Sequence, residues 1–166
     1  MFLDICQGHG QDGTVSGYID RNIYKDIDCD INGHIGGDIN GDINGDINGE
    51  VEGNINGDIN GNIWGHVYGD INGIIRGNID GARIDGSVTG NILGSIKGQI
   101  KGDVKGNILG DLTGEIGGDL IGSVLGDTQA VIAGDFIGSL LGKGNLVSKG
   151  NIIVSVYLHI NEKNIY

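Results

Sequence analysis

The chain has 166 residues, including 35 glycines and no proline, with 38% apolar residues and a formal net charge of −12. The lack of proline excludes collagen, and the regular recurrence of Ile and Val disfavours a disordered chain. No apolar run approaches the ~18 residues of a membrane span, and the first residues lack the basic start and apolar run of a signal peptide. We therefore expect no membrane partner and an intracellular or virion location.

The negative charge is concentrated in the N-terminal half. Residues 1–81 contain 14 acidic and 3 basic side chains, whereas residues 82–166 contain 8 acidic and 7 basic ones. This distribution disfavours a nucleic-acid partner, whose phosphates would be repelled, and favours cations or a basic protein surface. The two cysteines, Cys6 and Cys29, are too few for a disulfide framework.

The chain begins with residues 1–12, which lack any repeat and which we expect to form an N-terminal cap. From residue 13 onward a four-residue phrase recurs, with Ile or Val at every fourth position from Val15 to Ile79. One extra residue enters near Ala82, and the phrase then resumes at Ile84 and continues to Leu140. We assign residues 13–142 to this repeat.

A period of four residues predicts strands. On an α-helix the repeated position would drift by about 40° per repeat, and each glycine would cost about 1 kcal/mol relative to alanine. In an extended chain, side chains two residues apart share a face, so the Ile and Gly positions point inward and the polar positions outward. We expect glycine at corners where a side chain would overfill the interior or where positive φ is needed. The predicted core ladder includes Ile39, Ile43, Ile47, Ile55, Ile59, Ile92 and Ile108.

A longer period of sixteen residues indicates how the strands are arranged. In the N-terminal half it brings Asn40, Asn56 and Asn72 into one register, and in the C-terminal half it repeats an outward leucine. We therefore predict an all-β fold, a single-chain β-solenoid (β-helix) with about 16 residues per coil, four sides of four residues, about nine or ten coils and capping end segments. Residues 143–166 contain an alternating strand pattern at 151–161, which we expect either to cap the rod or to be donated to a neighbour in an assembly.

The phrase Gly41-Asp42-Ile43-Asn44 resembles a shortened form of the A-[DN]-L-x-x phrase of pentapeptide-repeat proteins. The resemblance covers roughly residues 13–142 and differs in having four residues per side and Gly in place of Ala. It implies a four-sided, right-handed β-helix in which a small and a large apolar residue point inward. In texture the sequence is also similar to the glycine-rich β-helices of viral and phage fibres.

The acidic repeats raise the question of cation binding. The hexad 28–33 matches the start of an EF-hand calcium loop, but Ile39 stands where the bidentate Glu should be. The sixteen-residue register stacks Asp26, Asp42 and Asp58 at about 4.8 Å. We expect these carboxylates to form a solvated acidic face with no resident metal, and the alternative is a ladder that orders divalent cations.

Two groups of outward apolar side chains are candidate interfaces. In the first, an apolar stripe occupies positions that hold polar residues elsewhere in the repeat, and we expect a protein to cover it. Its members are Leu93, Leu109, Leu125, Leu141, Ile121 and Ile137. In the second, Trp64 and Tyr68 flank His66 and form either a contact site or a packing surface for a terminal segment.

The sequence contains no convincing catalytic constellation. The histidines lack metal-ligand spacing, and the serines have no plausible His/Asp partners, so we expect no enzyme and no cofactor. Our leading hypothesis is a rigid, non-enzymatic rod that serves as a structural or assembly protein, such as a minor capsid, tail or fibre component of a virion, with itself or other subunits as partners. The alternative is an acidic binding module that mimics nucleic acid or displays a cation-binding repeat.

Overall fold

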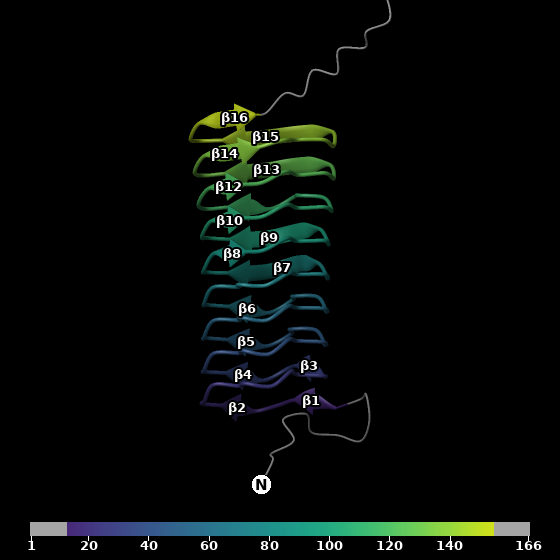
Figure 1. The fold of residues 1–166 in the computed structure, drawn as a ribbon, viewed down its shortest axis with the longest axis vertical. Coiled ribbons are helices and arrows are strands. Elements are labelled where there is room, and N and C mark those ends of the chain that lie inside the picture. Colours follow the sequence, from purple (N-terminus) through teal and green to yellow (C-terminus); the bar gives the residue numbers. More distant parts are fainter. Residues whose placement is uncertain (1–12, 155–166) are drawn as a thin grey trace, which may run out of the picture.

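The computed structural model describes residues 13–154, which form a single stack of coils with strands and no helix (Figure 1). Each turn of the chain lies on the one before it, from β2 at one end of the stack to β16 at the other (Figure 1). Every strand pairing is parallel, as expected when successive coils run in the same direction. The protein is an all-β parallel solenoid, as the sequence predicts. Within residues 13–154 no helix is long and apolar enough to cross a membrane.

The coil has four sides, which we number from one corner. In the coil of residues 45–60, the first side is 45–48, the second 49–52, the third 53–56 and the fourth 57–60. The second sides form a nine-stranded sheet, so the described stack has nine levels. This sheet contains β2 (Tyr18–Ile19), β4 (His34–Ile35), β5 (Glu50–Val51), β6 (His66–Val67), β7 (Ile79–Ile84), β9 (Ile96–Ile100), β11 (Glu115–Ile116), β13 (Thr128–Ile132) and β15 (Gly144–Ser148).

The other sides have shorter or less regular pairing. On the first side, β1 (Thr14–Val15) pairs with β3 (Asp30–Ile31). On the third side, the C-terminal half forms a five-stranded sheet. Its strands are β8 (Val88–Thr89), β10 (Val104–Lys105), β12 (Leu120–Ile121), β14 (Phe136–Gly138) and β16 (Ile152–Val154). Elsewhere single β-bridges join the coils at the centre of each side.

The register repeats every sixteen residues, with one exception. Ile39 pairs with Ile55, which is sixteen residues on, but Ile71 pairs with Val88, which is seventeen residues on. The extra residue is absorbed within β7, where the register shifts between Asp80 and Arg83. This irregularity lies at Ala82, where the repeated phrase gains its additional residue.

The core is a continuous column of side chains inside the coil. All seven residues of the predicted core ladder are fully buried, with 0% exposure, and they belong to a single cluster that runs through the stack. Thr128 is the one polar residue buried among the described residues. Burial of each Ile or Val stabilises the fold by about 1.5–3 kcal/mol, so the core gives the rod most of its cohesion.

Glycine occupies the corners of the coil for a different reason from the one we expected. A Cβ atom at Gly57 would overlap the backbone carbonyl of Gly41, and a Cβ at Gly53 would overlap that of Gly37. Glycine is therefore required at these corners because the preceding coil approaches too closely for a side chain, not because the interior would be overfilled. Positive φ occurs at only five of the described glycines, namely Gly17, Gly81, Gly90, Gly122 and Gly144.

The Asp and Asn residues that follow the glycines hold the coils together. The backbone N–H of Asp42 donates to Oδ1 of Asp26 at 2.9 Å, and the N–H of Asp58 donates to Oδ1 of Asp42 at 2.8 Å. Serine can take the same role, since Oγ of Ser95 accepts the N–H of Asp111 at 3.0 Å. Such acceptor ladders run along the first, third and fourth sides. The position therefore selects a short side chain that carries an oxygen acceptor.

The stack extends beyond the boundary that the repeat suggested. β15 pairs in parallel with β13, and β16 pairs in parallel with β14, so residues 143–154 continue the solenoid. The glycine frame is interrupted after residue 142, but the chain keeps its sixteen-residue register. The expected N-terminal cap at 1–12, and the part of the expected strand after residue 154, lie outside the described residues.

The cysteine count did not predict the state of Cys29. This side chain is buried in the first coils and is disulfide-bonded. The second cysteine of the sequence, Cys6, lies outside the described residues.

Candidate functional site

The leading candidate site is the group of apolar side chains on the C-terminal half of the rod, which we call the apolar strip. It has two columns that each follow the coil register. The leucine column contains Leu93, Leu109, Leu125 and Leu141, and the isoleucine column contains Ile121, Ile137 and Ile153. Leu93, Leu109, Leu125, Ile121 and Ile137 are 37–43% exposed, and Leu141 is 70% exposed. A substantial part of the surface of each of these side chains therefore meets water.

The same two columns are polar in the N-terminal half. The amide nitrogen of Asn56 donates to Oδ1 of Asn40, and that of Asn72 donates to Oδ1 of Asn56, both at 2.9 Å. These asparagines are in register with the isoleucine column further along the rod. In the other column, the amide nitrogen of Asn60 donates to Oδ1 of Asn44. Amide ladders of this kind satisfy one another and remain compatible with water.

The change from amides to apolar side chains occurs near Arg76. Its guanidinium ends the amide column, because Nη1 donates to Oδ1 of Asn60 at 2.8 Å and to Oδ2 of Asp58 at 2.9 Å. Leu93 is the next residue in this column. In the isoleucine column the change is more gradual, through Thr89 and Lys105. Position within the rod, and not position within the coil, therefore decides whether these columns are polar or apolar.

Each carboxylate of the acidic ladder has a structural role. Asp26, Asp42 and Asp58 stack in one column, and Oδ1 of each accepts a hydrogen bond from a backbone N–H of the next coil. The N–H of Ile74 and the guanidinium of Arg76 hold the pKa of Asp58 below its usual range. Among residues 13–154 no group of three or more His, Cys, Asp or Glu side chains is placed to hold a metal ion.

A second cluster lies on the second side of the N-terminal coils. The rings of Tyr18 and His34 meet edge to face, with centroids 4.8 Å apart. Nδ1 of His34 lies 3.5 Å from Oε2 of Glu50, and its Nε2 lies 3.0 Å from Oε1 of Glu52. The direction of the latter contact does not suit a hydrogen bond, since Nε2 is buried without an aligned partner. The charge of Asp20 raises the pKa of Tyr18.

The cluster continues two levels further along the rod. The rings of His66 and Tyr68 stack with centroids 3.8 Å apart. Oδ1 of Asp85 lies 2.7 Å from Nε of Arg83 and 3.1 Å from Nζ of Lys101. These two cations hold the pKa of Asp85 well below its usual range. Sequence reasoning missed this ion-pair group, although the sixteen-residue separation of Asp85 and Lys101 was a usable signal.

Trp64 and Tyr68 do not belong to the apolar strip. Trp64 lies on the first side and Tyr68 on the second side of one coil, in columns that contain no residue of the strip. Both side chains are exposed, at 48% and 44%. The structure therefore divides the predicted interface residues between two separate surfaces.

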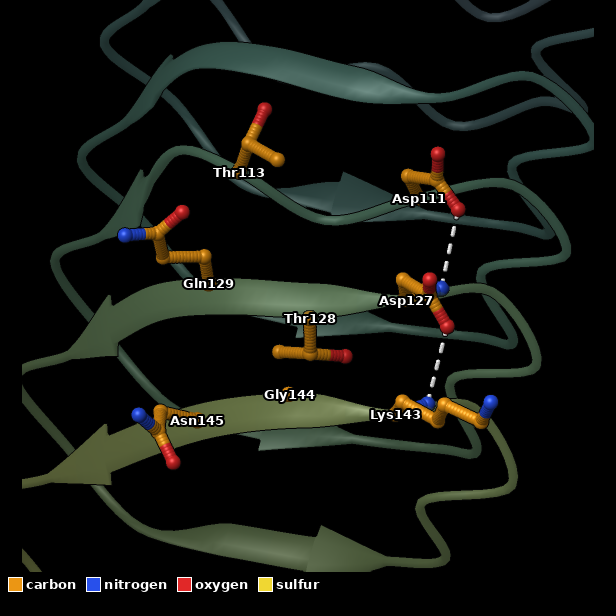
Figure 2. Close-up of a pocket in the computed structure, with 8 residues that line it drawn as sticks. All are labelled: Asp111, Thr113, Asp127, Thr128, Gln129, Lys143, Gly144 and Asn145. Atoms are coloured by element: carbon orange, nitrogen blue, oxygen red, sulfur yellow. Dashed lines mark hydrogen bonds between the residues drawn. The ribbon is translucent and has the colours of Figure 1, made fainter.

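The rod surface has two shallow hollows of note. One, of about 690 Å³, follows the corner between the first and second sides of the N-terminal coils and is bordered by Tyr18, His34, Glu50 and His66. The other, of about 410 Å³, lies on the first side of the C-terminal coils (Figure 2). Figure 2 shows its polar wall, where the N–H of Lys143 donates to Oδ1 of Asp127 at 2.9 Å. Both hollows offer hydrogen-bonding groups without the apolar enclosure that small-molecule sites usually have.

Comparisons of the chain with protein-family models, with curated proteins and with solved structures found no match.

Proposed function

We propose that this protein is a non-enzymatic structural rod that joins a larger assembly through its apolar strip. The observation that carries the proposal is the change within two columns from hydrogen-bonded asparagines to exposed leucines and isoleucines. The fold does not demand this change, because the same positions accept amides in the N-terminal half. An apolar surface with no structural reason is typical of a contact with another protein.

The rest of the rod suits a structural role. Its stiffness comes from a buried core and from backbone hydrogen bonds between every pair of neighbouring coils. Nine levels at about 4.8 Å give a rod of roughly 40 Å. The similarity in texture to the glycine-rich β-helices of viral and phage fibres motivates the further proposal that the assembly is a virion, with this chain as a minor capsid, tail or fibre component.

The test compares the wild-type protein with a variant in which the strip copies the N-terminal half. The double substitution Leu109→Asn and Leu125→Asn restores the residue type that the same column carries at Asn44 and Asn60. Sedimentation velocity over a range of concentrations should show association of the wild type and its loss in the variant. Val131→Asn, at an exposed apolar position on the second side, is the matched control and should leave association unchanged. Association that survives the double substitution would contradict the proposal.

A second candidate function is an acidic binding module. The observation in its favour concerns the carboxylates of the N-terminal ladders. In each one Oδ1 accepts a backbone N–H, and the second oxygen can contact a partner. The partner would be a basic protein surface. Calorimetric titration with poly-lysine should show binding that weakens when Asp38, Asp42 and Asp46 are replaced by Asn, which preserves the ladders. Equal binding by both proteins would rule this candidate out.

A further inference from the structure

We infer that the occupant of the apolar strip is a second copy of this chain, packed antiparallel so that only the C-terminal levels of the two rods overlap. This inference rests on the proposed function and adds the identity and orientation of the partner. It follows from the chemistry of the strip, from its place on the rod and from the distribution of charge.

The chemistry of the strip favours self-association. The two apolar columns are separated by Ser123 and Ser139 and contain no carboxylate. A contact with two-fold symmetry uses the same patch on both copies, so the patch must complement itself. An apolar patch does this, whereas a charged patch repels its own copy. A two-fold axis that lies in the contact plane, perpendicular to the rods, sets the leucine column of one rod against the leucine column of the other, and the isoleucine columns likewise.

The place of the strip restricts the overlap. The leucine column begins at Leu93 and ends at Leu141, a distance of three coil spacings, or about 14 Å. Before Leu93 the same column carries Arg76 and asparagines, whose desolvation would oppose burial. The rods can therefore bury apolar surface only along the C-terminal four or five levels.

The charge selects the antiparallel arrangement. Residues 1–81 carry 14 acidic and 3 basic side chains, whereas residues 82–166 are nearly neutral, with 8 and 7. A parallel pair would place the two acidic halves side by side, and their repulsion would oppose association. An antiparallel pair places the nearly neutral halves together and points the acidic halves in opposite directions. The result is an elongated dimer about one and a half times as long as a single rod.

The size of the strip predicts a reversible dimer. Stable interfaces bury roughly 800 Å² per partner, and a strip of seven aliphatic side chains about 14 Å long provides less. We therefore expect a dissociation constant in the micromolar range, on the order of 10 μM. The acidic halves lie apart, so the constant should change little between about 0.05 and 0.5 M NaCl, where screening would strengthen a parallel pair.

The experiment combines mass with shape on the full chain. Sedimentation equilibrium gives the stoichiometry and dissociation constant, and small-angle X-ray scattering gives the maximum dimension of the same samples. We expect a monomer–dimer equilibrium whose dimer is clearly longer than the monomer. Leu109→Asn with Leu125→Asn should raise the dissociation constant at least about tenfold, because apolar contacts at the centre of an interface carry most of its energy. Val131→Asn should leave it unchanged.

The possible outcomes separate this inference from the function on which it rests. A dimer no longer than the monomer, a dimer that tightens strongly with salt, or multimers larger than two would overturn the antiparallel pair. In those cases assembly through the strip would still stand, provided that the double substitution abolished association. A monomer at every concentration would overturn both.

Discussion

Most corner positions require glycine because the neighbouring coil leaves no space for a side chain, and fewer require it because of a positive φ. Two glycines allow these two causes to be compared. At Gly57 a Cβ would overlap the carbonyl of Gly41, whereas at Gly81 nothing lies within 4 Å but φ is +68°. Gly81→Asn should cost little, because asparagine tolerates positive φ. Gly57→Asn should cost about 1–3 kcal/mol or more, because the backbone in its way belongs to another coil. Urea unfolding of both variants provides the measurement, and equal losses would contradict the explanation.

The acceptor ladder depends on an oxygen and not on a charge. Oδ1 of Asp42 accepts the N–H of Asp58 at 2.8 Å. Asp42→Ala removes the acceptor and should lower the free energy of unfolding by about 0.5–1.5 kcal/mol, whereas Asp42→Asn keeps it and should be nearly neutral. Equilibrium denaturation of the two variants distinguishes hydrogen bonding from charge. Equal destabilisation by Asn and by Ala would show that the carboxylate charge is what matters.

Two carboxylates make the rod sensitive to acid. The N–H of Ile74 and the guanidinium of Arg76 lower the pKa of Asp58, and Arg83 with Lys101 lowers that of Asp85. Since both folded pKa values lie below the unfolded value of about 3.9, their contribution is present above that pH and is lost as pH falls through the folded values. The free energy of unfolding should therefore fall below about pH 4.

Asp85→Asn isolates one of these contributions. Protonation of the 22 acidic residues also relieves repulsion, which acts in the opposite direction, so the wild-type profile alone mixes two effects. The difference in unfolding free energy between wild type and Asp85→Asn should shrink as pH falls from about 5 to 2. A difference that stays constant over this range would exclude the ion pairs of Asp85 as its cause.

The buried centre of each side is the part of the repeat that tolerates least change. Ile59 is fully buried, and it pairs with Ile43 in the preceding coil and with Ile75 in the following one. Ile59→Val should cost about 0.5–1.5 kcal/mol and Ile59→Ala about 2–5 kcal/mol, because the coil cannot collapse around the cavity. Thermal unfolding followed by circular dichroism checks the order. A similar cost for Asn60→Ala, which changes an outward position, would contradict the inward assignment.

The repeat predicted the coil but not its contacts. A period of four with Ile at one position determines which side chains enter the core, and a period of sixteen determines which residues stack, as Ile43 and Ile59 do. The structural roles of glycine and aspartate depend on how closely two coils approach each other. The spacing of these residues in the sequence does not give that distance. For the candidate site, the register placed the leucine column correctly in one line. To predict the ion pairs of Asp85, one needs both the register of the coils and the length of the side chains that surround it.

The end of the solenoid shows a further limit of pattern reading. The glycine frame is broken after Gly142, where Leu146 takes the next position, yet Gly144 and Ile152 still take central positions opposite Thr128 and Phe136. Backbone hydrogen bonds between coils do not require the phrase, so the register outlasts it. A boundary drawn where the pattern stops therefore underestimates the folded rod.

The whole rod behaves as a one-dimensional stack, and a deletion can test this directly. Removal of residues 57–72 takes out one complete coil and joins Asn56 to Gly73, which restores the same phrase that Asn72 and Gly73 form now. Because each coil contacts only its neighbours, the shortened chain should fold, with an unfolding m-value lower in proportion to its length. Removal of residues 57 and 58 alone is the control. It leaves a two-residue side and shifts the following isoleucines into register with the corner glycines of the preceding coil, where there is no room for a side chain. This deletion should cost far more stability than loss of the entire coil. If the two-residue deletion proved the milder of the two, side chains sixteen positions apart would not be stacked as the register requires.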